Sequence, residues 1–142
     1  MTSNEWKSKG DFIQVNNNRL FVIDTNNDSN KTQKSMVILH GYPTSSFDYY
    51  KIVPEISKHY RVIIHDHLGF GFSDKPKDVD YSLVKQADIA LELWRQLDLK
   101  NIHLVAHDYG TSVATEIIAR YNANELDIKI EKLILTNGSV HV

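Results

Sequence analysis

The sequence is 142 residues long, 42% hydrophobic and 24% charged, which fits one domain with a hydrophobic core and excludes a disordered tail. Sixteen Lys and Arg against eighteen Asp and Glu give a net charge of -2, which argues against nucleic acid or an anionic membrane surface as a partner. The absence of cysteine excludes disulfides and thiolate metal sites. The polar start lacks a signal peptide, and no apolar run reaches the length of a membrane span, so we expect a cytoplasmic protein.

Two patterns in the chain predict the strands of a sheet. Alternation over residues 11–25, "DFIQVNNNRLFVIDT", predicts a β-hairpin with its turn at residues 16–18, and the Asn-rich residues 25–33 predict a loop. Short apolar runs such as "SMVILH" and "IHLVAH" are typical of buried parallel strands. These runs cover Ser35–His40, Arg61–Asp66, Ile102–His107 and Ile130–Thr136.

Three helical segments alternate with these strands. They are expected over Phe47–His59, where Pro54 interrupts the helix, over Ser82–Leu97, and over Tyr109–Asn122. Ser82 is the expected N-cap of the second helix. The apolar face of that helix consists of Leu83, Ala87, Ala90, Leu91, Trp94 and Leu97. Regular alternation predicts a single open α/β domain over residues 1–142, with ligands beyond the carboxyl ends of the strands.

Two loops follow predicted strands. "HGYPTSS", from His40 on, either belongs to a functional site or is a tight turn into a capped helix. "HDHLGFGFSDKP" contains Gly69 and Gly71 but no third glycine at position 74, so we interpret it as a loop and not as a dinucleotide-binding fingerprint. His65 and His67 could bind a metal ion, but no third ligand is in view, and a hydrogen-bonded structural pair is the favoured interpretation.

"VAHDYGTS", residues 105–112, places Asp108 where a strand meets a helix. An N-cap is the simplest interpretation, because Asp is a preferred cap and the helix dipole stabilises its charge. Ala106 and Gly110 are small, however, as a sharp turn with a strained non-glycine residue requires. The pattern matches a nucleophile elbow, with alanine at the first glycine position and Asp108 in place of serine.

Together, "HGYPTSSFDYYKI", "LGFGFSDKP", "HDYG" and "LTNG" resemble the α/β-hydrolase fold family, in particular its branch of epoxide hydrolases and haloalkane dehalogenases. The resemblance covers nearly the whole chain. It implies the N-terminal part of that fold, a hairpin followed by a mostly parallel sheet of about six strands with flanking helices, with the cap and last strands missing. The matching motif residues are His40, Gly41, Pro43, Asp66, Gly69, Gly71, Ser73, His107 and Gly110.

The resemblance also implies the chemistry of a hydrolase. Asp108 would attack a saturated carbon and form a covalent ester, which water activated by a histidine would cleave. The backbone N–H groups of Tyr109 and Tyr42 would form the oxyanion hole. Haloalkane dehalogenases usually bind halide through indole and amide N–H groups at these two positions, so two tyrosines favour opening of an epoxide. The substrate would be a small molecule, and neither a cofactor nor a metal is implied.

The catalytic base and acid are expected in a missing C-terminal half. His141 is the only histidine after the elbow, but it directly follows the last predicted strand, and the uncharged Asn137 stands near where some dehalogenases place their acid. Residues 130–136 would then form an exposed apolar edge that could associate with another chain. Two alternatives remain open: a non-catalytic fragment or binding module, and, less favoured, a serine-type esterase using Ser112.

Overall fold

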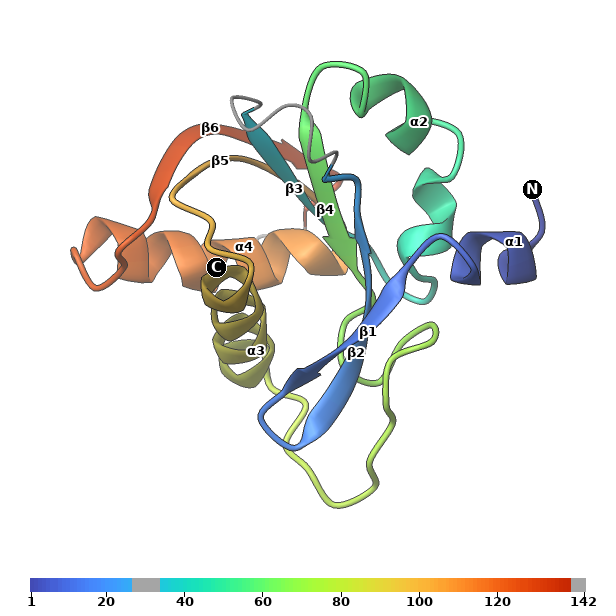
Figure 1. Cartoon of the computed structure of the whole chain (residues 1–142). Coiled ribbons are helices and arrows are strands. Elements are labelled where there is room, and N and C mark those ends of the chain that lie inside the picture. Colours follow the sequence, from blue (N-terminus) through green and yellow to red (C-terminus); the bar gives the residue numbers. More distant parts are fainter. Residues whose placement is uncertain (27–33, 139–142) are drawn as a thin grey trace.

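The computed structural model describes residues 1–26 and 34–138 and contains a six-stranded sheet with the order β1-β2-β4-β3-β5-β6 (Figure 1). The strands are β1 (Asp11–Val15), β2 (Asn18–Asp24), β3 (Ser35–Leu39), β4 (Arg61–His65), β5 (Asn101–His107) and β6 (Lys129–Thr136). β2 pairs antiparallel with β1 and β4, and the remaining neighbours are parallel. The predicted hairpin and strands are confirmed. Most of the predicted loop at residues 25–33 lies outside the described residues.

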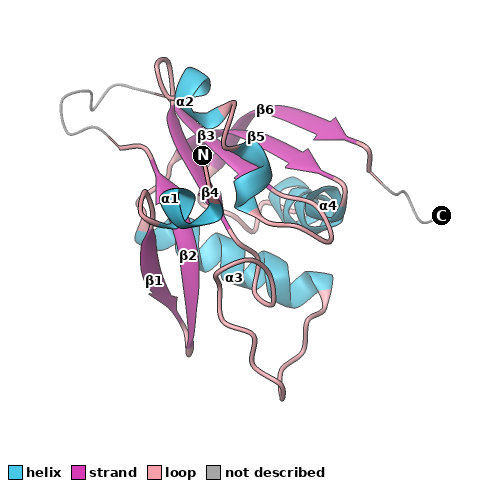
Figure 2. Ribbon diagram, turned by 90° about the vertical axis from the view of Figure 1, so that its right-hand side faces the viewer, coloured by secondary structure: helices cyan, strands magenta, loops and turns pink. Residues whose placement is uncertain are grey.

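Helices cover both faces of the sheet (Figures 1 and 2). They are α1 (Ser3–Lys7), the 3-10 helix η1 (Ser46–Tyr49), α2 (Val53–Ile56), α3 (Leu83–Gln96) and α4 (Tyr109–Asn122). Pleating sends alternate side chains of a strand to opposite faces. Val37 and Leu39 of β3 therefore pack in the cluster that contains α3 and α4 residues, whereas Ile38 packs with Trp6 of α1 and Val53 of α2. No described helix is both long and apolar enough to cross a membrane.

The second predicted helix forms as α3, with the expected cap. The Ser82 hydroxyl accepts a hydrogen bond from the Lys85 backbone N–H at 3.3 Å. Ala87, Ala90 and Trp94 of the predicted apolar face are buried, as expected. Leu83 begins the helix and, unlike these three residues of the same face, remains 38% exposed.

A continuous helix does not form over residues 47–59. η1 and α2 are two short pieces, and Pro54 stands in the first turn of α2, where a missing backbone N–H costs no intrahelical hydrogen bond. Helix α1 was not predicted, because it is only five residues long and a single one of them, Trp6, is buried. The Trp6 indole N–H donates to the Ser46 hydroxyl at 3.0 Å, which ties the N-terminus to η1.

Strand β6 forms one edge of the sheet and is the most exposed of the strands in the described part of the chain. Leu133, Ile134 and Leu135 retain 41%, 50% and 47% of their surface in contact with solvent. Consecutive residues of a strand point to opposite faces, so β6 is open on both faces as well as along its edge. The predicted exposed apolar edge is therefore present.

Candidate active site

The carboxyl ends of β3, β4 and β5 meet at one edge of the sheet. Leu39, the last residue of β3, is in register with His65 of β4 and with Ala106 of β5. The segments that follow these strands begin at His40, Asp66 and Asp108. Parallel strands thus bring together motif residues that lie up to 68 positions apart in the sequence. An open α/β sheet usually binds its ligand at this end of its strands.

Asp108 has an unusual backbone conformation, with φ 49° and ψ -117°. A non-glycine residue at positive φ costs of the order of 1–3 kcal/mol, and tertiary contacts must hold it there. The Asp108 N–H donates to the Thr136 carbonyl at 3.0 Å, and the Asp108 carbonyl accepts from the Thr111 N–H at 2.9 Å. The end of β6 and the first turn of α4 therefore fix this residue from both sides.

Asp108 differs from an ordinary N-cap in two respects. A typical cap residue is extended and accepts from the second or third helical N–H. The Asp108 carboxylate instead accepts from Tyr109, the first residue of α4, and from Tyr42 in the loop after β3. Capping therefore does not account for its geometry.

Two glycines permit this close arrangement. A Cβ at Gly110 would lie 2.3 Å from the Leu39 carbonyl oxygen, so only glycine lets α4 begin so close to β3. A Cβ at Gly41 would lie 2.9 Å from the Asp108 Cβ. Ala106, the small residue on the strand side, is fully buried.

The Asp108 carboxylate receives two backbone hydrogen bonds on one oxygen. Its Oδ1 accepts from the Tyr42 N–H at 2.8 Å and from the Tyr109 N–H at 2.6 Å. These two bonds, the Tyr42 bond first, lower the pKa of Asp108 and outweigh the opposing effect of burial, so the group is held as a carboxylate. The two N–H groups that were predicted as oxyanion donors thus converge on a single oxygen position.

Phe70 and the two residues that supply the N–H donors form a cluster of aromatic rings. Tyr42 is 69% exposed, and its ring meets Phe70 edge-on at 6.2 Å. Phe70 in turn contacts Tyr109 at 5.3 Å between ring centroids. Burial raises the pKa of the Tyr109 hydroxyl. Phe70 was missed by the sequence reasoning, although its position between Gly69 and Gly71 in the loop after β4 was a usable signal.

Asp66 follows β4 directly and connects two segments by hydrogen bonds. Its carboxylate is fully buried and accepts the Ser46 N–H on one oxygen and the Phe72 N–H on the other, each at 2.7 Å. Gly71 has φ 47°, and a Cβ there would lie 2.0 Å from the Asp66 carboxylate. The Ser73 hydroxyl donates to the Asp66 carbonyl at 2.6 Å. These motif residues build the loop between β4 and α3, with Gly69 in the left-handed region at φ 91°.

The histidines near the carboxyl ends of the strands differ in burial: those after β3 and around the end of β4 are buried, whereas His107 is only partly buried. His40, His65 and His67 are buried, and burial lowers the pKa of each, that of His65 to about 3. The expectation of a hydrogen-bonded pair at His65 and His67 was wrong in part, because Nδ1 of both rings has no hydrogen-bond partner among the described residues. His107, beside Asp108, places its Nδ1 3.0 Å from the Thr136 hydroxyl.

No group of three potential metal ligands occurs among residues 1–26 and 34–138. Pro43 follows Tyr42 through a cis peptide bond in the loop after β3. His141, the other histidine weighed from the sequence, lies outside the described residues.

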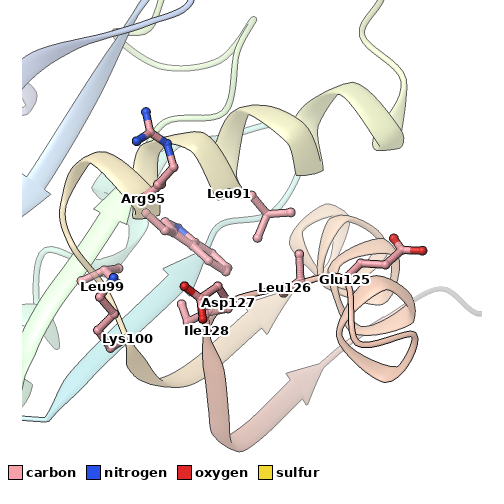
Figure 3. Close-up of a pocket in the computed structure, with 9 residues that line it drawn as sticks. Leu91, Arg95, Leu99, Lys100, Glu125, Leu126, Asp127 and Ile128 are labelled. Carbon is pink, nitrogen blue, oxygen red and sulfur yellow. The ribbon is translucent and has the colours of Figure 1, made fainter.

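A cavity of about 230 Å³ lies elsewhere, between the end of α3 and the segment that joins α4 to β6 (Figure 3). It is lined by apolar residues, among them Leu91, Leu99, Leu126 and Ile128, and by charged residues. Leu99 and Ile128 precede β5 and β6, so this cavity lies at the amino ends of the strands. Asp108 is at the opposite end of β5, and its strained backbone and converging donors make that end the candidate active site.

A mostly parallel α/β sheet with a strained residue between β5 and α4 defines a class of fold known from many enzymes. A family model described as "alpha/beta hydrolase fold" matches residues 34–142, and the chain belongs to this family. Over 139 residues it is 43% identical to the mesoderm-specific transcript homolog protein of Homo sapiens, covering 95% of this chain and 41% of that protein. The chain therefore spans about two fifths of the length of this relative.

Two further relatives connect the chain to the dehalogenase branch. Over 105 residues it is 32% identical to haloalkane dehalogenase 1 of Mycobacterium bovis, covering 72% of this chain and 33% of that protein. The crystal structure of haloalkane dehalogenase DatA from Agrobacterium tumefaciens C58 superposes with a TM-score of 0.77 at 25% identity, covering 92% of this chain and 41% of that chain. The resemblance inferred from the sequence motifs is confirmed at the level of family and fold.

Proposed function

We propose that this chain is the N-terminal part, over residues 1–142, of a hydrolase core that uses Asp108 as a nucleophile on a saturated carbon, as epoxide hydrolases and haloalkane dehalogenases do. One observation carries the proposal: Asp108 is strained at positive φ while one carboxylate oxygen accepts two backbone N–H groups. Family membership and the dehalogenase relative support it.

In this proposal the two oxygens of Asp108 have different tasks. The Tyr42 and Tyr109 N–H groups orient Oδ1 and leave Oδ2 as the attacking atom. Attack forms a bond from Oδ2 to the electrophilic carbon and breaks the bond from that carbon to the epoxide oxygen or halide, which takes the electron pair. Water gives a proton to the base and adds to the carbonyl carbon of the ester, and the same two N–H groups stabilise the oxyanion that forms on Oδ1 in the tetrahedral intermediate. Collapse of this intermediate breaks the bond from that carbon to Oδ2, which leaves with the alcohol product and takes up a proton, and the Asp108 carboxylate is restored with one oxygen from water.

We favour an epoxide over a haloalkane as the substrate. Tyr42 and Tyr109 occupy the positions where the resemblance implies N–H donors for a leaving halide, and their side chains carry hydroxyls instead. Together with Phe70 they form a cluster of aromatic rings. The substrate class is therefore a small epoxide with an apolar substituent.

The base that activates water, and the acid that protonates the alkoxide, belong to polypeptide beyond residue 142 in this proposal. The Nδ1 of His107 pairs with Thr136, and the chain covers 41% of the human relative. The test uses the longest natural polypeptide that contains this chain, incubated with styrene oxide and, separately, with a bromoalkane.

The expected result is diol formation that Asp108→Ala abolishes and Asp108→Asn slows severely, with a mass adduct of one substrate trapped on the wild-type protein. The control is Ser112→Ala, which should retain turnover, because that hydroxyl lies in the second turn of α4. Unchanged turnover in Asp108→Ala refutes the proposal, and hydrolysis of a nitrophenyl ester that requires Ser112 supports the serine-esterase alternative.

The exposed strand β6 favours the second candidate function, a non-catalytic module that associates through this edge. Ile134→Lys should then shift the elution of the chain toward the monomer, with a stability loss below about 1 kcal/mol because the side chain is half exposed. An oligomeric state that does not change in Ile134→Lys contradicts this candidate.

A further inference from the structure

The peptide group that joins Gly41 to Tyr42 is held at both of its ends. Its N–H, on Tyr42, donates to Asp108 Oδ1 at 2.8 Å. Its carbonyl oxygen, on Gly41, lies 2.8 Å from Nδ1 of the buried His40 ring. A peptide group is planar, so whatever holds its oxygen also fixes the direction in which its N–H points.

The hydrogen bonds of His40 determine which ring nitrogen carries the proton. Its Nε2 accepts the backbone N–H of His67 at 3.0 Å, so this nitrogen must be unprotonated. The proton of the neutral ring therefore resides on Nδ1, which can donate to the Gly41 carbonyl. Burial favours the neutral ring, in agreement with this assignment.

A second contact links the loops that follow β3 and β4. The Nε2 of His67 lies 3.1 Å from the His40 carbonyl oxygen, and the two rings are 4.3 Å apart. His40 thus bridges the buried segment after β4 and the peptide group that contacts Asp108. One imidazole ring therefore connects the His67 backbone to the peptide group that carries the Tyr42 N–H.

We propose that His40 is a positioning residue, whose Nδ1–H orients the Gly41–Tyr42 peptide group so that the Tyr42 N–H points at the Asp108 carboxylate. This proposal rests on the proposed function only for its catalytic consequence, because the orientation itself can be measured without substrate. In this proposal the His40 side chain sets the direction of one of the two backbone N–H donors.

The test compares His40→Asn with His40→Gln in the isotope-labelled chain. The amide nitrogen of Asn can take the place of Nδ1 and donate to the Gly41 carbonyl, whereas the amide oxygen of Gln can take the place of Nε2 and accept from His67. In His40→Gln we expect the Tyr42 amide hydrogen to exchange roughly five- to tenfold faster, as for the loss of one hydrogen bond, and the pKa of Asp108 to rise. In His40→Asn both quantities should stay near their wild-type values.

Three outcomes overturn the proposal. One is equal disturbance of Tyr42 in the two variants, as a general packing role of His40 would give. Another is a disturbance in His40→Asn alone. The third outcome needs no variant and therefore remains decisive if either substitution prevents folding. Long-range proton–nitrogen coupling in the wild-type chain should show a proton on Nδ1 of His40. A proton on Nε2 instead excludes the proposal. Loss of turnover in Asp108→Ala tests the catalytic role separately, so the two ideas can fail independently.

Discussion

Asp66 follows β4 at the same end of the sheet as Asp108, and its replacement should destabilise the chain. Its fully buried carboxylate accepts two backbone N–H groups, from Ser46 and Phe72, at 2.7 Å each. Hydrogen bonds to a charged acceptor contribute about 1.5–3 kcal/mol each. Asp66→Asn keeps one acceptor oxygen but turns an NH₂ group toward the other backbone N–H, so the expected loss is about 2–4 kcal/mol. Asp66→Ala removes both bonds and should cost roughly 3–6 kcal/mol.

The assay is urea unfolding of the chain at neutral pH, followed by the fluorescence of the buried Trp6 and Trp94. Asp98→Asn is the matched control, because the Asp98 side chain is 84% exposed and asparagine tolerates its φ of 53°. The control should remain within about 0.5 kcal/mol of wild type. A loss below about 1 kcal/mol in Asp66→Asn, with an unchanged control, would refute the scaffold role.

Two further predictions concern packing and pH. Gly110→Ala places a Cβ 2.3 Å from the Leu39 carbonyl oxygen; we expect a loss of about 2–3 kcal/mol and a melting temperature lower by roughly 10 °C, and an unchanged melting curve would contradict the packing of α4 on β3. Burial lowers the pKa of His65 to about 3 and that of His67 well below its ordinary value near 6.5. The unfolded chain therefore binds more protons than the folded chain below about pH 6.5, so the free energy of unfolding should decrease as the pH is lowered, by about 1.4 kcal/mol per pH unit for each histidine that stays neutral in the folded chain. For His65 this decrease should continue down to about pH 3. Urea unfolding at pH 7, 6 and 5 measures this slope, and equal stability at the three values would contradict it.

Elements with a strong local pattern could be predicted from the sequence. The apolar runs at Ser35–Leu39 and Asn101–His107 form β3 and β5, and the helical periodicity after Ser82 forms α3. Hydrophobic period and capping are properties of neighbouring residues, so a linear pattern is enough to reveal them. The segment after Ser46 was predicted less well, because its short helical pieces depend on contacts such as that between Trp6 and Ser46.

For the candidate site, the sequence alone determined the family motifs, the position of Asp108 between a strand and a helix, and the small residues around it. Only the tertiary structure decided the strand order, the burial of Asp66 as a loop scaffold, and the orientation of the Tyr42 N–H by His40. The physical reason is distance along the chain. Tyr42 and Asp108 are 66 positions apart, and no local pattern specifies that a backbone N–H of one segment meets a carboxylate of another. That meeting exists because β3 and β5 pair in parallel, and pairing is a property of the whole sheet.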